Sequence, residues 1–275
     1  MLYLTGDIHG DKYESSKLWR KPFSQTAKDL TKDDYVIIAG DFGWLWSRGS
    51  DRREEKALDY LEKQPYSTLF IDGNHENFDR LYSLDVEEKF GGPVGVLRPH
   101  VLHLKSRGHI YIIDGYRIWC FGGATSFDRA FRKEGKNWWP QEEPLEEEYV
   151  RGEKELEGVG WRVDLILTHD APYQIAKYLL QEENREQRPV EQTRVTEYLQ
   201  AVAKKTSFSR WYFGHYHKDR DYAVYGQTFG GSVSEPKYFS CICDRILKHS
   251  APEIQGELTW RDFRKYEESF IWSSF

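Results

Sequence analysis

Short apolar runs recur along the chain, and each ends at a glycine or at a cluster of polar residues. Their length and their richness in Val, Ile, Tyr and Phe predict buried β-strands. We expect strands at residues 2–5, 35–39, 68–71, 110–113, 117–121, 164–168, 211–213, 222–225 and 238–243. The pair Asp114-Gly115 separates two of these runs. It predicts a tight hairpin, because both residue types tolerate the positive φ angles of a type I′ turn.

Helical patterns lie between several of these strands, at residues 51–63, 77–84, 144–157, 173–181 and 193–205. The first opens at Asp51, a residue type that caps helix N-termini, and it places Ala57, Leu58 and Leu61 on one face. Strands alternate with helices early in the chain and follow one another later. This order indicates an α/β fold in which mixed sheets are covered by helices.

The length of the chain limits the number of domains. Its 275 residues suffice for one large domain with a well-buried core, so a second domain is not required. We assign this domain to residues 1–250. The remaining residues, 251–275, are rich in Trp, Phe, Asp and Glu. We interpret them as a C-terminal extension of unknown role, either an accessory helix or a partner contact.

Composition narrows the functional class. A hydrophobic content of 39% and a charged content of 31% are typical of a globular protein. The net charge of −6 gives no electrostatic support to stable nucleic-acid binding. No run approaches the roughly 18 apolar residues of a membrane span, and the strand-like residues 2–5 leave no room for a cleavable signal. The three cysteines are odd in number and fit no disulfide framework. We therefore expect a cytoplasmic protein without a membrane partner.

Polar motifs follow five of the predicted strands directly. They read Gly6-Asp7-Ile8-His9-Gly10, Gly40-Asp41-Phe42-Gly43, Gly73-Asn74-His75-Glu76, Thr168-His169-Asp170 and Gly214-His215-Tyr216-His217. Because the carboxyl ends of strands in α/β sheets converge on one crevice, we expect these side chains to meet. A single histidine after a strand is more often a hydrogen-bonded core residue than a ligand. Here five of the nine histidines lie in the motifs, which favours a shared site.

These motifs supply carboxylate, amide and imidazole groups. The absence of a thiolate from the set disfavours a structural zinc site or an iron–sulfur cluster. Two divalent metals about 3.5–4 Å apart need a shared anionic ligand. Asp41 is the natural bridge, since it is the only motif carboxylate on a strand of its own. One metal would then be held by Asp7, His9 and His217, and the other by Asn74, His169 and His215.

The order of the motifs, DxH, GD, GNHE, H and GHxH from Gly6 to His217, resembles the calcineurin-like metallophosphoesterase superfamily. Stretches such as GDFGW, FIDGNHENFD, FGGATSFDR, WWPQE, THDAP and WYFGHYHKD look like a bacterial branch of it. The resemblance implies a four-layer α-β-β-α sandwich, with two mixed sheets flanked by helices and two metals at one end. It also implies the ligand grouping above. We expect two divalent metal ions, manganese or iron, with magnesium, nickel or zinc as alternatives.

The activity implied is hydrolysis of a phosphomonoester or phosphodiester. Water held between two metals is acidified, so hydroxide is available to attack phosphorus in line, and the metals offset charge on the phosphoryl oxygens. The leaving oxygen needs a proton, and His75 is the candidate general acid, a role that the resemblance supports. Glu76 or Asp170 either orients an imidazole or is an ordinary loop acid.

Residues 122–143 are the expected substrate determinant. They follow a predicted strand and contain Arg129 and Arg132, and arginines bind phosphate in a bidentate manner. The alternative is a solvated basic loop. We expect a small phosphorylated substrate, while protein partners stay open.

The second motif departs from the family pattern. Many relatives read GDxxD there, whereas Trp44 occupies the last position in this chain, and the Asp-Arg-Gly of Ser/Thr phosphatases is missing as well. The alternatives left are a Ser/Thr-type phosphoprotein phosphatase, a nuclease and a non-catalytic scaffold. A scaffold would have lost ligands, and this chain retains them.

Overall fold

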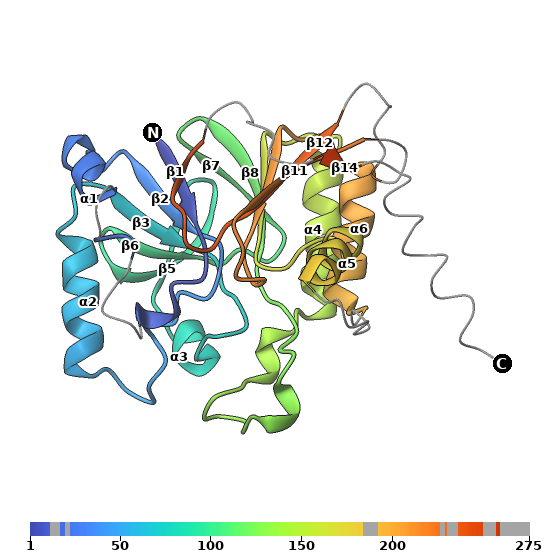
Figure 1. The fold of residues 1–275 in the computed structure, drawn as a ribbon. Coiled ribbons are helices and arrows are strands. Elements are labelled where there is room, and N and C mark those ends of the chain that lie inside the picture. The colour runs from blue at the N-terminus through green and yellow to red at the C-terminus, as the bar shows by residue number, and fades with distance from the viewer. Residues whose placement is uncertain are drawn as a thin grey trace.

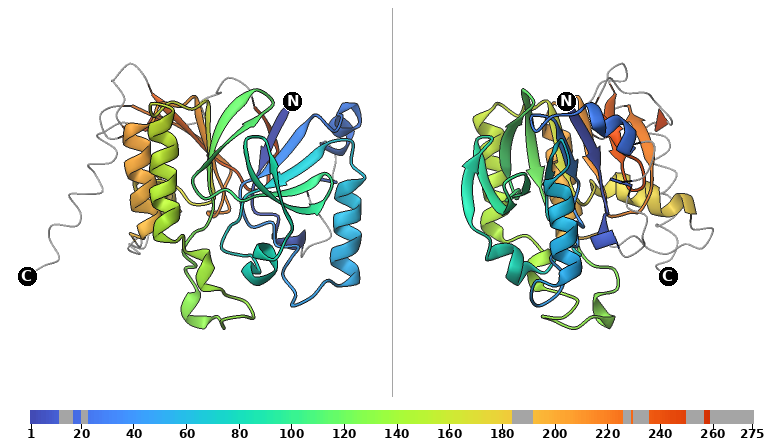
Figure 2. Two further views of the ribbon diagram at one scale, coloured as in Figure 1. Left: turned by 180° about the vertical axis from the view of Figure 1, so that it is seen from behind. Right: turned by 90° about the vertical axis from the view of Figure 1, so that its left-hand side faces the viewer.

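The computed structural model describes residues 1–11, 17–19, 23–183, 192–225, 229, 236–249 and 257–258. In this part of the chain, two mixed β-sheets lie face to face and helices cover their outer faces (Figure 1 and Figure 2). Of the predicted extension at 251–275, only strand β14 (Glu257–Leu258) falls within the described residues. The expectation of an accessory helix or partner contact there lies outside them.

Each sheet has a parallel centre with antiparallel strands on either side, and the second sheet ends in one more parallel pair. The first sheet has the order β13 (Leu247–Lys248), β1 (Leu2–Thr5), β2 (Tyr35–Ile38), β3 (Ser67–Phe70), β6 (Val101–Leu104), β5 (Gly92–Arg98) and β4 (Val86–Lys89). The second has the order β14, β11 (Arg220–Val224), β12 (Lys237–Cys241), β10 (Arg210–Phe213), β9 (Leu165–Thr168), β8 (Tyr116–Phe121) and β7 (His109–Ile113).

Helices form the two outer layers. On the first sheet lie α1 (Phe23–Thr26), α2 (Arg52–Glu62) and α3 (Phe78–Tyr82). On the second lie α4 (Glu146–Gly158), α5 (Tyr173–Glu183) and α6 (Arg194–Lys205). The carboxylate of Asp51 accepts hydrogen bonds from the backbone amides of Arg53 and Glu54, which confirms the predicted cap of α2. No helix of the described residues is long and apolar enough to cross a bilayer.

Three hydrophobic clusters fill the spaces between the layers. Alternate residues of β2 divide between two of them, as the two-residue period of a strand requires. Val36 and Ile38 pack toward α2, while Ile37 packs between the two sheets. Strands buried on both faces read as continuous apolar runs. The predicted four-layer α-β-β-α sandwich is therefore confirmed.

The nine predicted strands are observed, with ends that shift by one or two residues. The pattern missed β4, β5 and β6, as well as the two-residue strands β13 and β14. Strand β4 is mostly exposed and polar, and β5 contains Pro93 and two glycines, which argue against a strand. Strand β6 is interrupted in the pattern by His103, whose ring is nevertheless buried beside Asp72.

A buried ion pair joins the layers behind the motifs. Arg107 is 3% exposed, and its guanidinium lies 2.8 Å from Asp72, which follows β3, and 3.1 Å from Glu148 in α4. Burial by itself would raise the pKa of the Asp72 carboxyl, but the adjacent Arg107 guanidinium holds that pKa below its usual range. A buried charge left without such a partner would be strongly destabilising. The pair therefore ties the first sheet to the helical layer of the second.

The register of the parallel strands brings the motifs to one edge. Thr5, Ile38 and Phe70 are neighbours at the ends of β1, β2 and β3. Thr168 and Phe213 are neighbours at the ends of β9 and β10. Each motif begins within three residues of these positions.

Candidate metal centre

The predicted ligands come together between the ends of the two sheets. The backbone amide of His215, after β10, donates a hydrogen bond of 3.0 Å to Oδ1 of Asp7, after β1. This contact joins the two sheets at the site. The structure brings the expected ligands into two groups that both include Asp41.

The first group consists of Asp7, His9, Asp41 and His217, whose ligand atoms all lie within 4.8 Å of one another. Nε2 of His9 lies 2.9 Å from Nε2 of His217 and 3.6 Å from Oδ2 of Asp41. Nε2 of His217 lies 3.8 Å from Oδ1 of Asp7. The carboxylates are buried, whereas the His217 side chain is 58% exposed, so this group opens to solvent.

The second group is buried more deeply. Oδ1 of Asn74 lies 3.0 Å from both Nε2 of His169 and Nδ1 of His215. Oδ1 of Asp41 lies 3.3 Å from Nε2 of His169. Asp41 therefore directs one oxygen to each group, and it also accepts a hydrogen bond of 2.8 Å from the backbone amide of His75.

The backbone at the ligands takes a strained conformation. Asp7, His9, Asp41, His215 and His217 all have φ angles between 51° and 67°. Non-glycine residues seldom adopt this left-handed region, and each instance costs on the order of 1–3 kcal/mol. Such strain persists only where the surroundings enforce it, and it turns consecutive ligands out of the strand ends toward a common centre.

Two glycines allow the close approach of the motifs. A Cβ atom at Gly40 would lie 2.1 Å from Nδ1 of His169, and one at Gly73 would lie 2.2 Å from Oδ1 of Asp41. Gly40 also has a φ of +86°. The glycines that precede Asp41 and Asn74 in the motifs are thus required by packing against the ligands themselves.

The charges of the centre are those expected of groups removed from water. Burial raises the pKa of Asp7 to about 7 and lowers that of His9 to about 4. Burial opposes the charge on His169, yet the adjacent Asp41 carboxylate raises the pKa of that imidazole to about 10. A cation between these groups would stabilise both carboxylates in their charged form.

The residues present fit divalent metal ions. Within the described part of the chain, the buried Oδ2 atom of Asp7 has no hydrogen-bond partner, which is costly for a carboxylate oxygen. The Nε2 atoms of His9 and His217 face each other at 2.9 Å, where a shared cation would accept both lone pairs. Carboxylate, amide and imidazole donors suit Mn²⁺, Fe²⁺, Zn²⁺ and related ions. The individual ligand roles stay predictions.

The loop 122–143 reaches the centre through one of the two predicted arginines. The guanidinium of Arg132 lies 3.1 Å from Nε2 of His75, and its Nε atom lies 2.5 Å from Asp128. Arg129 instead lies over the ring of Trp138, at 4.9 Å. The two arginines do not share a helical face, because the 3₁₀ turn Arg129–Phe131 ends before Arg132, which is extended. The structure separates the two residues that the sequence paired.

Neither predicted carboxylate orients an imidazole by a hydrogen bond in the described residues. Glu76 is fully buried and accepts hydrogen bonds from the backbone amides of Phe42 and Gly43. Asp170 accepts hydrogen bonds from the hydroxyl of Tyr216 and from the backbone amide of Ala171. Of the two roles that the sequence left open, the imidazole partner is not observed: Glu76 satisfies backbone donors of the second motif, and Asp170 satisfies a hydroxyl and a backbone amide.

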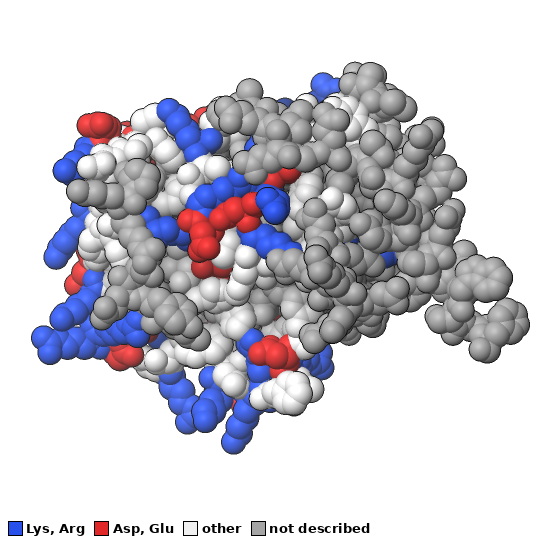
Figure 3. Space-filling model, viewed as in Figure 1, with Lys and Arg blue, Asp and Glu red and all other residues white. Residues whose placement is uncertain are grey.

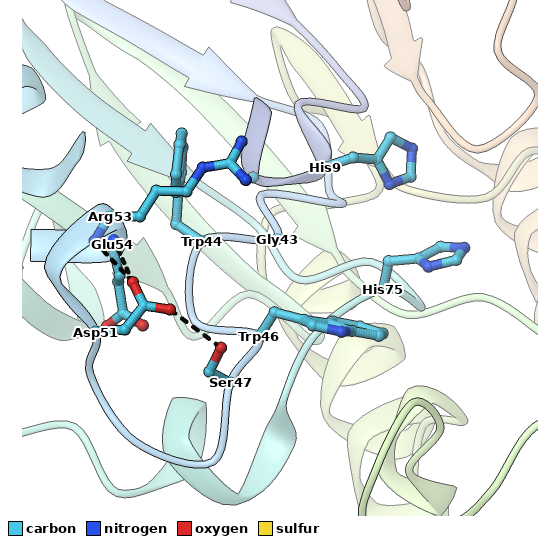
Figure 4. Close-up of a pocket in the computed structure, with 10 residues that line it drawn as sticks. His9, Gly43, Trp44, Trp46, Ser47, Asp51, Arg53, Glu54 and His75 are labelled. Atoms are coloured by element: carbon cyan, nitrogen blue, oxygen red, sulfur yellow. Dashed lines mark hydrogen bonds between the residues drawn. The ribbon is translucent and has the colours of Figure 1, made fainter. Parts of the chain in front are cut away.

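A cleft of about 140 Å³ opens beside His9 and His75. Figure 4 shows His9 and His75 on one side of it, Trp46 below them, and Arg53 beside Trp44 on the other side. The ring of Trp46 lies 6.0 Å from that of His75 and packs against Trp139. The cleft therefore leads away from the centre along a wall of aromatic side chains.

Sequence reasoning overlooked several residues at this centre. Phe127 stacks on His215 at 4.9 Å. Ser126 accepts a hydrogen bond from the side-chain amide of Asn74, and Glu142 is buried behind Ser126. Ser126 and Glu142 lie in the stretches FGGATSFDR and WWPQE, which are therefore the sequence signal for them.

Two mixed sheets with flanking helices, and Asp and His side chains gathered at the strand ends, define the fold of the metal-dependent phosphatases. The sequence model of the calcineurin-like phosphoesterases matches residues 2–219, and the chain belongs to this family. A search of curated proteins found no match to the chain. The resemblance inferred from the motifs is thereby confirmed.

Gly40 can be tested against a glycine with the same backbone conformation. Gly91 also has a φ of +86°, but nothing lies within 4 Å of a Cβ atom placed there. Both Gly→Ala variants add strain of roughly 1–2 kcal/mol. Only Gly40→Ala should displace His169, so we expect it to lose bound Mn²⁺ in elemental analysis after dialysis, while Gly91→Ala keeps it.

Equal metal contents in the two variants would contradict this account of Gly40. Thermal unfolding shows whether each variant is folded. Gly73→Ala serves as a second variant, because its Cβ atom would meet Asp41 without any strain from a positive φ angle.

Proposed function

We propose that this protein hydrolyses phosphate esters with two divalent metal ions held at the shared carboxylate of Asp41. The observation that carries the proposal is the pair of donor groups on either side of Asp41, one with His9 and one with His169. Two bound ions would supply an activated water and a Lewis acid for the phosphoryl oxygens. Manganese or iron is the proposed native metal, and a cytoplasmic location stays a prediction.

His75 is placed to serve the leaving group. Its backbone amide is fixed on Asp41, and its ring centroid lies 5.0 Å from that of His9 at the mouth of the cleft. Burial and the neighbouring Arg132 charge lower the pKa of His75. A bound phosphate dianion beside Arg132 would offset that charge and favour the protonated imidazole, which can then donate to the departing oxygen.

The surroundings of the centre support a small organic ester. The cleft beside His75 gives the organic group of the ester a place to lie, against Trp46. Arg132, from the loop 122–143, lies 3.1 Å from Nε2 of His75 and is suited to a phosphoryl oxygen. On the face drawn in Figure 3, acidic and basic side chains of the described residues are interspersed, so this face offers no broad track for a nucleic-acid backbone.

The proposal is tested with Asp41→Asn and a matched control. Asp114 lies in the β7–β8 turn and has nearly the same φ, 52° against 51° for Asp41. We expect Mn²⁺-dependent hydrolysis of p-nitrophenyl phosphate or its bis ester by the wild type, and the ratio of the two rates separates monoesterase from diesterase. Asp41→Asn should lose both metal and activity, while Asp114→Asn keeps both. A wild type that binds Mn²⁺ yet hydrolyses no phosphoester would support the scaffold alternative.

His75→Asn should separate chemistry from metal binding. Since general-acid catalysis typically contributes about 10²–10⁴-fold, we expect kcat to fall within that range on an alkyl phosphate, with metal content unchanged. The loss should shrink with p-nitrophenolate, a leaving group that needs little protonation. If the variant loses its metals, or loses kcat equally on both substrates, His75 is not the proton donor.

The two arginines of the loop provide the next comparison. A charge-assisted hydrogen bond contributes roughly 1.5–3 kcal/mol, which is about ten- to a hundredfold in binding. Arg132→Ala should lower kcat/KM by about that factor and weaken inhibition by inorganic phosphate in parallel, with metal content unchanged. Arg129→Ala should change either quantity by less than about threefold, because its guanidinium lies over Trp138. Similar losses in the two variants would contradict a specific role for Arg132.

A further inference from the structure

The side chain of Asn74 has two different ends, and only one of them can bind a cation. Its oxygen lies toward His169 and His215, and its Nδ2 atom lies 3.0 Å from Oγ of Ser126. If the amide were turned over, its N–H groups would face the cation site. Asparagine oxygen and nitrogen are nearly the same size, so packing alone does not choose between the two orientations. A hydrogen-bond partner must do so.

The hydroxyl of Ser126 makes that choice because it has a single proton. This proton is donated to Oε2 of Glu142 over 2.6 Å, so a lone pair of Oγ is left to accept from Asn74. The other oxygen of Glu142 accepts a hydrogen bond of 3.0 Å from the backbone amide of Ser126. A carboxylate can only accept hydrogen bonds. Glu142 therefore determines the direction of both side-chain hydrogen bonds, from Ser126 to Glu142 and from Asn74 to Ser126.

Both residues are enclosed by the protein. Ser126 is 3% exposed and Glu142 is 0% exposed. Reversing the Ser126 hydroxyl would leave a buried carboxylate oxygen without its donor, which costs about 1–3 kcal/mol or more for a charged group. Glu142 cannot easily move away either. Its backbone carbonyl, and that of Gln141, accept hydrogen bonds from Arg107, which is paired with Asp72.

We propose that Ser126 and Glu142 are positioning residues that hold the amide oxygen of Asn74 toward the cation site shared with His169 and His215. The proposal rests on the metal centre of the proposed function and deepens it. It gives a role to the stretches FGGATSFDR and WWPQE, which contribute Ser126 and Glu142. Partners behind a ligand commonly change metal affinity by about 10–100-fold when removed.

A merely structural role is the competing explanation, since the same contacts also close the base of the loop. Glu142→Gln distinguishes the two. A glutamine of the same shape still bonds to Ser126, but its NH₂ group would donate to Oγ and turn the hydroxyl proton toward Asn74. The loop therefore keeps its contacts while the direction of the chain of hydrogen bonds is reversed.

The first experiment is calorimetric titration of metal-free protein with Mn²⁺. We expect two sites in the wild type. Ser126→Ala and Glu142→Gln should weaken one of them by about ten- to a hundredfold and change the other by less than about threefold. Thr125→Val is the matched control from the neighbouring position, because the buried Oγ1 of Thr125 has no hydrogen-bond partner in the described residues. It should leave both sites unchanged.

A second experiment removes the need for orientation. Asn74→Asp offers an oxygen at either end of the side chain, so adding Ser126→Ala to it should weaken Mn²⁺ binding by less than about threefold. If the losses of Mn²⁺ affinity caused by Asn74→Asp and by Ser126→Ala add fully in the double variant, the proposal is contradicted. Thermal unfolding of every variant establishes whether it is folded. If Asn74→Asp does not fold, Glu142→Gln by itself still tests the inference.

The NMR spectrum of the metal-free protein gives a test that does not depend on bound metal. The side-chain amide resonances of Asn74 should shift in Ser126→Ala and Glu142→Gln, because the partner of Nδ2 is lost or reversed, and they should not shift in Thr125→Val. Two wild-type sites with unaltered affinities and amide resonances in both variants would overturn this inference and leave the proposed function intact. Fewer than two Mn²⁺ sites in the wild type would overturn the two-metal proposal and this inference together.

Discussion

The buried carboxylate of Asp41 is the interaction on which the rest of the centre depends. It is 1% exposed, and both of its oxygens are engaged, one toward His9 and the other toward His169 and the backbone amide of His75. A charge removed from water must be compensated where it lies. The imidazoles and the amide do so in part, and two cations on either side would complete the compensation. A single residue thereby couples the two donor groups.

The fold stabilises a centre that is costly to build. Several ligands have left-handed backbone conformations, and two glycines are needed to let the motif loops touch. Parallel strands buried on both faces anchor those loops, and the Arg107–Asp72 pair ties the layers together behind them. The strain is tolerable because buried strands and close contacts hold these residues in place. Stability and function are therefore located in adjoining parts of the same strands.

The loop 122–143 acts on the centre from two sides. Near its middle, Arg132 reaches His75 at the face where substrate would enter. At its base, Ser126 contacts Asn74 from behind, and Glu142 accepts the hydrogen bond of the Ser126 hydroxyl. In Figure 1 this loop, drawn in green, projects beyond the edge of both sheets. Its ends are held by buried contacts while its middle is exposed. Such a loop can vary its substrate contacts without disturbing the ligands.

Much of this protein follows from its sequence alone. Short continuous apolar runs predicted most of the strands, because a strand buried on both faces must be apolar throughout. The positions of Asp, His and Asn directly after those runs predicted one convergent centre, because parallel strands end at a common edge. Strands β4 and β5 escaped this reasoning, since β4 is an exposed, polar edge strand and β5 is interrupted by a proline and two glycines.

Tertiary structure alone decided which of the remaining polar residues serve the centre. Arg129 and Arg132 are alike in sequence, yet only Arg132 reaches His75, because the chain leaves the 3₁₀ turn between them. Ser126 and Glu142 are distant in sequence and meet only because the loop closes on itself. Local sequence patterns indicate which segments are buried and where strands end. The partner of a polar group depends on long-range geometry, which no local pattern contains.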